Sequence, residues 1–285
     1  MEILNTIKLL RFPFSIFLLP VTLFSFYYIQ PDLNYTSLMV LAIWHLLVFP
    51  SSNGYNGYHD ADEGPVGGLA KPPKPVKLLI YASNVFDLLA LVLSLSITLY
   101  FSFFVLVYII ASRLYSNRSI RLEKYPFSGF LIVFIFQGAW IFYANLFAFS
   151  AFDLLTNTHI IYSAIACSFL IATVYPLTQI YQHKADEKDG VRTLSMLLGI
   201  KGTFVFAGLM FLTAGFFLFL SFLEQVSLNN FLLFNVILLP STLFFLVWGI
   251  KSFKNEVHVN FKNTMAMLII SSLLTNIYFL ILLFN

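Results

Sequence analysis

The sequence predicts an all-α, polytopic integral membrane protein, a bundle of nine transmembrane helices around a central cavity, and three observations support this fold class. Of its 285 residues, 59% are hydrophobic and 10% are charged, whereas a soluble domain has about 25% charged residues. The mean hydropathy is +0.86. Apolar runs that could cross a hydrocarbon core of about 30 Å recur along the whole chain. We therefore expect a single transmembrane domain over residues 1–285.

The apolar runs follow one another with short polar connections between them. The expected spans lie near residues 12–30, 36–52, 78–95, 97–115, 127–149, 158–180, 200–222, 229–250 and 264–284. The apolar stretch from Leu78 to Leu114 is too long for one span, so the number of spans depends on whether this stretch forms one helix or two.

The distribution of basic residues favours two helices. With nine spans, all 16 Lys and Arg lie on one side of the membrane, whereas a single helix over residues 78–114 would place five on one side and 11 on the other. Because Lys and Arg concentrate on the cytoplasmic side, we expect nine spans with the N-terminus in the cytoplasm. The basic residues are spread over five membrane-edge segments, a dispersion that argues against nucleic-acid binding.

The first polar stretch on the cytoplasmic side covers residues 53–77. Oxygen-bearing side chains gather in its first part, at Asn56, Asp60, Asp62 and Glu63. Asn56 and Asp60 are four residues apart, so a helix would place them on one face, where both could direct an oxygen at one cation. Solvated ends of membrane helices also carry charge, and for one acidic stretch alone that explanation is the more common one.

The second polar stretch, residues 179–192, repeats this spacing. Gln182 and Asp186 are also four residues apart, and on a continuous helix the same face would include Gln179 and Asp189. Two such stretches on the same side of the membrane favour a shared cation site over two unrelated helix ends.

Basic residues follow the first stretch after a break at GPVGG, where glycines and a proline end any helix. The segment KPPKP fixes an extended backbone, and its two lysines, Lys71 and Lys74, project to the same side at about three residues per turn. Such a pair suits a diphosphate group.

These residues resemble the motifs of the UbiA superfamily of intramembrane prenyltransferases. The first family motif is Asn-Asp-x-x-Asp-x-x-x-Asp, and Asn56 and Asp60 match its first Asn and its first spaced Asp. An Arg-Pro-x-Arg-Pro element follows in the family, and Lys71-Pro72 with Lys74-Pro75 match it with Lys in place of Arg. Tyr115-Ser116 with Arg121 and Lys124, and Arg11 ahead of Pro13, also resemble family elements, so the likeness covers almost the whole chain.

The sequence departs from the family pattern at three positions. Gly57 replaces the Asp that follows Asn, and Gly64 stands where the last Asp of the first motif would fall, so that Asp62 or Glu63 must substitute for it. The second family motif is Asp-x-x-x-Asp, and Gln182 occupies its first position. Each missing carboxylate weakens a site for hard cations.

The resemblance implies Mg²⁺-dependent transfer of an isoprenoid chain from a prenyl diphosphate to a small lipophilic acceptor, such as an aromatic compound or a quinone precursor, with release of diphosphate. It implies catalytic roles for Asp60 and Asp186. The implied metal ligands are Asn56, Asp60, Asp62, Glu63, Gln182, Asp186 and Asp189, and the implied diphosphate-binding residues are Lys71, Lys74, Arg121 and Lys124. No nucleic acid and no obligate protein partner are expected. The active site should face the cytoplasm at the inner or plasma membrane.

Two other functions stay open. A terpene cyclase of the same superfamily would ionise the diphosphate and let the chain attack itself. A secondary transporter could use the carboxylates for ion coupling, although they lie at helix ends and not at the membrane midplane.

Two isolated polar residues lie inside expected spans. Asp87 lies about 13 Å along the third span, where it either contacts the acceptor or a metal-bound water, with Asn84 nearby, or makes a structural hydrogen bond to a neighbouring helix. His45 has no second His at ligand spacing, so we interpret it as a packing residue.

Overall fold

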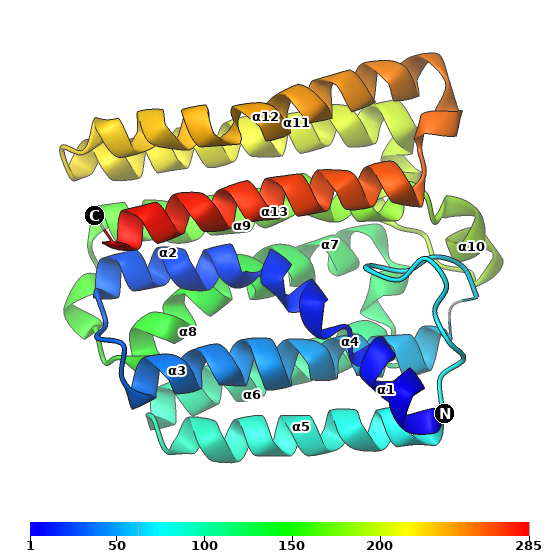
Figure 1. Ribbon diagram of the computed structural model, residues 1–285, viewed down its shortest axis with the longest axis horizontal. Helices are drawn as coiled ribbons and strands as arrows, with labels where there is room; N and C mark the ends of the chain where they lie inside the picture. Colours follow the sequence, from blue (N-terminus) through cyan, green and yellow to red (C-terminus); the bar gives the residue numbers. More distant parts are fainter. Residues whose placement is uncertain (62, 285) are drawn as a thin grey trace.

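The computed structural model describes residues 1–61 and 63–284. Asp62, one of the predicted metal ligands, lies outside the described residues. The rest of the chain is built from helices joined by loops, and its β-structure is one isolated bridge between Val66 and Leu69 within the described part. The long helices run side by side as a bundle (Figure 1).

The elements of the first half include the motif-bearing helix α4. They are α1 (Glu2–Leu10), η1 (Phe12–Phe17), α2 (Leu19–Ile29), α3 (Tyr35–Ala42), η2 (Ile43–Val48), α4 (Phe49–Asp60), α5 (Lys77–Leu95), α6 (Leu99–Ser116), η3 (Leu122–Lys124), α7 (Pro126–Phe134), η4 (Ile135–Ala139) and α8 (Trp140–Ala148).

The second half contains the longest helices. Its elements are η5 (Phe152–Leu154), α9 (Thr158–Gln179), α10 (His183–Lys188), α11 (Leu194–Glu224), α12 (Leu228–Lys254), η6 (Glu256–His258) and α13 (Phe261–Phe284).

The number of spans agrees with the sequence. Among the described residues, eight helices are long and apolar enough to cross a membrane, and a ninth span results if Glu2–Phe17 and Leu19–Ile29, which meet at 46°, are counted together. The apolar stretch after Leu78 forms two helices, α5 and α6, and the Thr98 hydroxyl accepts the Phe101 N–H at 3.0 Å to begin the second. The termini lie at opposite ends of the bundle, as an odd number of spans requires (Figure 1). Which end faces the cytoplasm stays a prediction.

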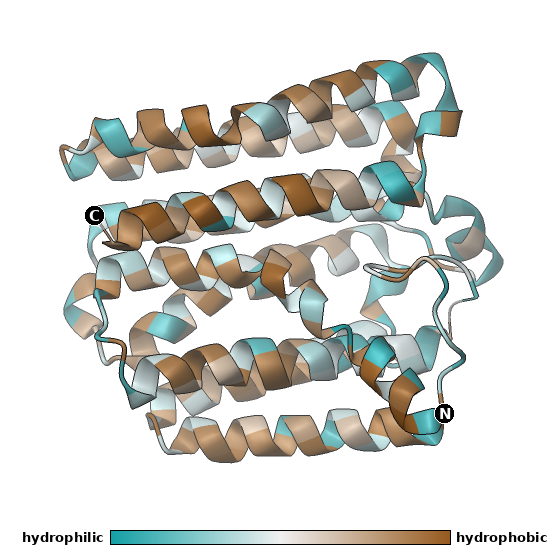
Figure 2. Cartoon of the chain, in the orientation of Figure 1, coloured by the Kyte–Doolittle hydropathy of each residue, from teal (hydrophilic) through white to brown (hydrophobic). Residues whose placement is uncertain are grey.

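The distribution of hydropathy follows this architecture. Apolar residues cover the long helices, and hydrophilic residues gather at α10 and in the loop between α4 and α5 (Figure 2). Both polar stretches therefore lie at the same end of the bundle, which is also the end where the chain begins (Figure 1).

The first span is bent near its start. Arg11 ends α1 with a left-handed backbone (φ 49°), and the short helix η1 follows with Pro13 in its first turn. This turn directs the Arg11 guanidinium inward, where it donates hydrogen bonds to the carbonyl oxygens of Asn53 at 3.2 Å and Gly67 at 3.5 Å. The bend thus connects the N-terminal helix to both α4 and the loop after it.

The second span is longer than the sequence predicted. We expected it to end near residue 52, but the helix continues through a π-helical turn, η2, and through α4 as far as Asp60. The Phe49 N–H donates to the Trp44 carbonyl five residues back, and Pro50 has no N–H to donate. Asn56 and Asp60 of the first motif are therefore part of a membrane helix.

Several buried polar groups in the bundle are paired across helices. The Trp44 indole donates to Asn145 Oδ1 at 3.0 Å, and Asn145 Nδ2 donates to the Ser25 hydroxyl at 2.9 Å. His45 contacts the Ser15 carbonyl at 3.1 Å and the Thr22 hydroxyl at 3.3 Å. His45 is therefore a packing residue, as its sequence context indicated.

Asp87 has a structural role. It forms an ion pair with Arg113 of α6 and accepts a hydrogen bond from the Ser51 hydroxyl of α4 at 2.5 Å. The Arg113 guanidinium in turn lies 3.8 Å from the centre of the Tyr55 ring. Asp87 does not line the central cavity, so of the two alternatives the hydrogen bond between helices is the one that the geometry supports.

Candidate active site

A cavity of about 290 Å³ lies at the polar end of the bundle, enclosed mainly by η1, α4, α6, α7, α9 and α10. Its polar lining includes Asn56, Asp60, Arg121, Glu123, Gln182 and Asp186. Its other walls are largely apolar and include Phe17, Phe49, Val133, Phe136, Ile171 and Leu268. The cavity thus joins a charged region to a hydrophobic one.

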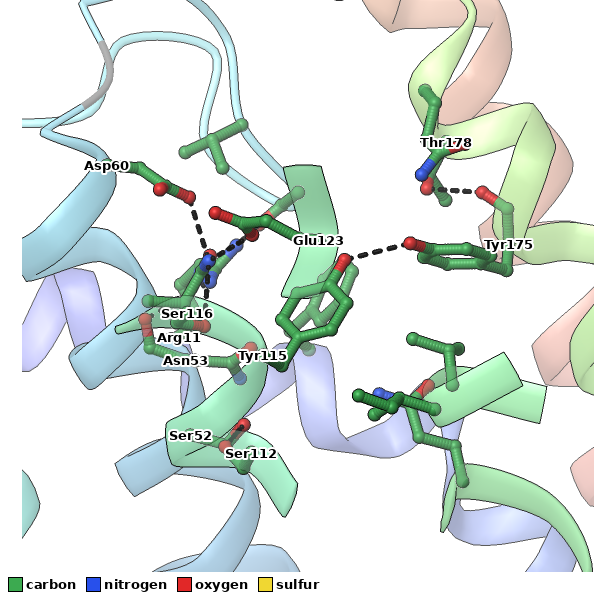
Figure 3. Close-up of a pocket in the computed structure, with 18 of the residues that line it drawn as sticks. Arg11, Ser52, Asn53, Asp60, Ser112, Tyr115, Ser116, Glu123, Tyr175 and Thr178 are labelled. Atoms are coloured by element: carbon green, nitrogen blue, oxygen red, sulfur yellow. Dashed lines mark hydrogen bonds between the residues drawn. The ribbon is translucent and has the colours of Figure 1, made fainter. Parts of the chain in front are cut away.

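Asn56 and Asp60 come together as their spacing predicts. Both lie on α4, and Asn56 Nδ2 donates to Asp60 Oδ2 at 2.7 Å. The same nitrogen lies 3.2 Å from the Ser116 hydroxyl and 3.3 Å from Glu123 Oε2. Three oxygens from α4, α6 and η3 therefore surround one amide nitrogen. The three side chains that carry them, Asp60, Ser116 and Glu123, lie close together in Figure 3.

Arg121 connects the two polar stretches. Its Nη2 lies 3.1 Å from Asp60 Oδ1, its Nε donates to Glu123 Oε1 at 2.9 Å, and it also pairs with Asp189 from the second stretch. Burial disfavours the charged form of Arg121, but its hydrogen bonds to Asp189 and Glu123 outweigh this effect and raise its pKa. Arg121 thus stays charged and holds the loop after α10 against α4.

Glu123 is a site residue that the sequence analysis missed. Its side chain is 10% exposed, and burial, together with the nearby charge of Asp60, raises its pKa to about 8 although Arg121 acts in the opposite direction. In the sequence, Glu123 lies between Arg121 and Lys124, two basic residues predicted to bind diphosphate. That isolated carboxylate was the available signal in the sequence.

Two tyrosines from different helices meet in the cavity. The hydroxyls of Tyr115, on α6, and Tyr175, on α9, lie 2.8 Å apart, and the two rings approach each other from opposite sides of the cavity (Figure 3). Tyr115 belongs to a family element in the sequence, whereas no motif marks Tyr175.

The second polar stretch differs from its prediction in one respect. It is not one continuous helix, because α9 ends at Gln179 and α10 begins at His183, with Gln182 at the junction. Gln179, Gln182, Asp186 and Asp189 nevertheless all line the cavity. The side chain of Gln182 donates to the Pro65 carbonyl at 3.3 Å, which connects this stretch to the loop after α4.

Four other predicted residues lie away from the cavity. Glu63, Lys71, Lys74 and Lys124 are exposed and do not line it. Lys71 and Lys74 lie in the non-helical segment that precedes α5, as the prolines predicted. The roles proposed for these four residues stay predictions.

The donors of the cavity suit Mg²⁺. In the described part of the chain, no three His, Cys, Asp or Glu side chains form a preformed metal group, but Mg²⁺ is commonly bound through one or two carboxylates together with substrate phosphates. Asn56, Asp60 and Asp186 provide hard oxygen ligands in the cavity lining. Gln179 Oε1, also in this lining, is buried and has no hydrogen-bond partner.

Solved structures share this fold. A UbiA homologue from Archaeoglobus fulgidus, solved bound to DMAPP and Mg²⁺, superposes with a TM-score of 0.71 at 18% identity, covering 98% of this chain and 99% of the homologue. The same homologue bound to GPP and Mg²⁺ gives 0.70 at 18% identity, covering 99% and 100%. A structure of digeranylgeranylglyceryl phosphate synthase gives 0.64 at 17% identity, covering 99% and 98%. At these identities the likeness shows the fold.

The family follows from the sequence itself. None of the curated protein sequences matches this chain significantly. The model of the UbiA prenyltransferase family, in contrast, matches residues 17–283, which is nearly the whole chain and includes both polar stretches. The resemblance that the motifs indicated is therefore confirmed, and the protein belongs to the UbiA prenyltransferase family.

Proposed function

We propose that this protein transfers an isoprenoid chain from a prenyl diphosphate to a lipophilic acceptor in the membrane, in a reaction that requires Mg²⁺. The observation that carries the proposal is a cavity that joins carboxylates, arginines and amides to apolar walls. A prenyl diphosphate is divided in the same way, with dense charge at one end and hydrocarbon at the other. Membership of the family supports the same activity.

The diphosphate would lie at the polar end of the cavity. Arg121 can bind phosphate oxygens through its planar guanidinium, and Arg11, also in the lining, adds a second positive charge. Asn56, Asp60 and Asp186 would hold Mg²⁺, which supplies Lewis-acid neutralisation of the departing diphosphate.

The isoprenoid chain would extend among the apolar walls. The bond between its allylic carbon and the diphosphate oxygen breaks with both electrons going to oxygen, and a nucleophilic atom of the acceptor forms the new bond and then loses a proton. The aromatic rings of Tyr115, Tyr175 and Phe136 line the cavity, and their faces can stabilise the positive charge that develops on carbon.

An aromatic compound or a quinone precursor suits the part of the cavity that η1 lines. Phe14 and Phe17 line the cavity there, with their ring centres 4.8 Å apart. Such rings pack favourably against a flat aromatic acceptor. The active site would face the cytoplasm, because the basic loops lie at its end of the bundle.

The experiment that tests this proposal uses purified protein in lipid nanodiscs, with a panel of radiolabelled prenyl diphosphates, Mg²⁺ and a total lipid extract. We expect diphosphate release to require both substrates, and mass spectrometry to identify a prenylated acceptor. Asp186→Ala should abolish release. Glu187→Ala, at the exposed neighbouring position on the same helix, should leave it unchanged.

Three outcomes would contradict the proposal. A prenyl product formed without any acceptor would indicate a cyclase. Uptake into sealed vesicles that does not depend on metal and is unaffected by Asp60→Ala would indicate a transporter. Absence of product across the whole panel would argue against prenyl transfer.

A further inference from the structure

The oxygens around Asn56 Nδ2 form an unusual arrangement for a hydrogen-bond donor. Asp60, Ser116 and Glu123 each present an oxygen to this nitrogen, at 2.7, 3.2 and 3.3 Å. An amide has two hydrogens for these three acceptors. Convergence of carboxylate and hydroxyl oxygens on one point is also the arrangement that a hard cation requires.

The charges that line the cavity do not balance. Its carboxylates are Asp60, Glu123, Asp186 and Asp189, and its guanidinium groups are Arg11 and Arg121. The lining therefore carries a formal charge of −2 when all six groups are ionised, of which Arg118, outside the lining and 4.0 Å from Asp189, offsets a part. A divalent cation would compensate this charge.

Gln179 provides an independent indication of a ligand in the same cavity. The residue is 8% exposed, and its Oε1 has no hydrogen-bond partner. An unpaired buried oxygen costs about 1–3 kcal/mol, a cost that a cation or a bound donor would remove. Gln179 and Glu123 line the cavity from different elements, α9 and η3.

Glu123 contacts Asn56 of the first motif, in which two family carboxylates are missing. Gly57 and Gly64 replace two Asp residues of the first motif, and neither glycine lines the cavity. Glu123, 67 residues away from Asn56 in the sequence, presents its carboxylate to the same amide.

We infer that Glu123 is a ligand of a divalent cation in this cavity and supplies a carboxylate that the first motif lacks. Asp60 would bind the same ion, and the Asn56 amide would turn so that its oxygen faces the site. The choice between nitrogen and oxygen in this amide follows from the hydrogen-bond network, and a cation would reverse it. The inference rests on the proposed function, because it places the cation at the site where the diphosphate would bind. Its test measures metal binding and does not require turnover.

The test measures binding of Mn²⁺, a paramagnetic substitute for Mg²⁺, by electron paramagnetic resonance of the full-length protein, with and without inorganic pyrophosphate. We expect Glu123→Gln to raise the Kd for Mn²⁺ at least about tenfold, since loss of even an outer-shell partner costs about 10–100-fold in metal affinity. The control is Glu187→Gln, an exposed carboxylate on α10 outside the cavity lining, which should leave the Kd unchanged.

Anomalous scattering from crystals of the wild-type protein soaked in Mn²⁺ gives a second readout that needs no variant. We expect a peak within coordination distance of a Glu123 oxygen. A Kd in Glu123→Gln within about twofold of the wild-type value, wild-type protein that binds no Mn²⁺, or a peak that contacts other residues but not Glu123 would each overturn the inference.

The two proposals can fail separately. Glu123-dependent binding of Mn²⁺ in a protein that forms no prenylated product would refute the proposed function and support the inference. Acceptor-dependent turnover with unchanged Mn²⁺ affinity in Glu123→Gln would support the proposed function and refute the inference.

Discussion

The ion pair between Asp87 and Arg113 allows a quantitative prediction. The two side chains are 13% and 18% exposed, and they connect α5 to α6 within the membrane-spanning part of the bundle. Replacing Asp87 with Ala would leave the Arg113 guanidinium buried without its counter-charge. Its remaining contacts would be the Ser51 hydroxyl, at 3.0 Å, and the Tyr55 ring.

We expect Asp87→Ala to lower the free energy of unfolding by about 3–5 kcal/mol, the usual effect of removing one partner of a buried pair. The double variant Asp87→Leu with Arg113→Met removes both charges and should lose less. Asn84→Ala is the matched control, because Asn84 lies three residues earlier on α5 and is exposed. It should change the free energy by no more than about 0.5 kcal/mol.

Equilibrium unfolding in mixed micelles, followed by tryptophan fluorescence, would measure these changes. An Asp87→Ala variant as stable as Asn84→Ala would refute the structural role that we assign to the pair. A double variant less stable than Asp87→Ala would show that the remaining charge is not the source of the loss.

Three further predictions concern the site and its orientation. Asp60→Ala and Asp186→Ala should each abolish turnover while the proteins still insert and fold, although Asp60→Ala should lower the Tm because Asp60 pairs with the buried Arg121 guanidinium; full activity in either variant would refute the metal site. The pKa of about 8 for Glu123 lies above its unfolded value of 4.5, so the folded state binds the extra proton. In EDTA the Tm should therefore fall as the pH rises from about 5 to 8, and Glu123→Gln should remove most of this fall. A Lys71→Cys variant should react with impermeant maleimide only from the cytoplasmic side, where the predicted topology places residue 71. The native Cys167 is buried and should not react. Labelling from the opposite side would reverse the predicted topology.

The fold could be predicted in most respects because membrane helices are encoded locally. The length of each apolar run predicts a span, and the distribution of Lys and Arg predicts that Leu78–Leu114 forms two helices and not one. The end of the second span could not be found in this way. Gly54 and Gly57 favour a helix end by intrinsic preference, but Gly54 packs so closely against α5 that an added Cβ would lie 2.6 Å from the Ser83 hydroxyl. Tertiary packing therefore extends the helix.

The candidate site was only partly predictable. Asn56 and Asp60 follow from helical spacing, which is a local property. Glu123 joins them through contacts across 67 residues, and no periodic pattern encodes such a contact. Tyr175 likewise meets Tyr115 only because α6 and α9 face the same cavity. The prolines of the KPPKP segment correctly predict a non-helical backbone around Lys71 and Lys74, but the distance of these lysines from the cavity depends on the course of the loop.

The central claim is that the cavity binds a prenyl diphosphate with its charged end beside α4 and α10. The most direct test is a structure of the wild-type protein with geranyl diphosphate and Mg²⁺. We predict that the diphosphate lies between Asp60 and Asp186, in contact with Arg121, and that the hydrocarbon chain extends towards Phe136. A diphosphate bound outside this cavity, or a chain that lies among the exposed basic residues of the loop before α5, would contradict the account.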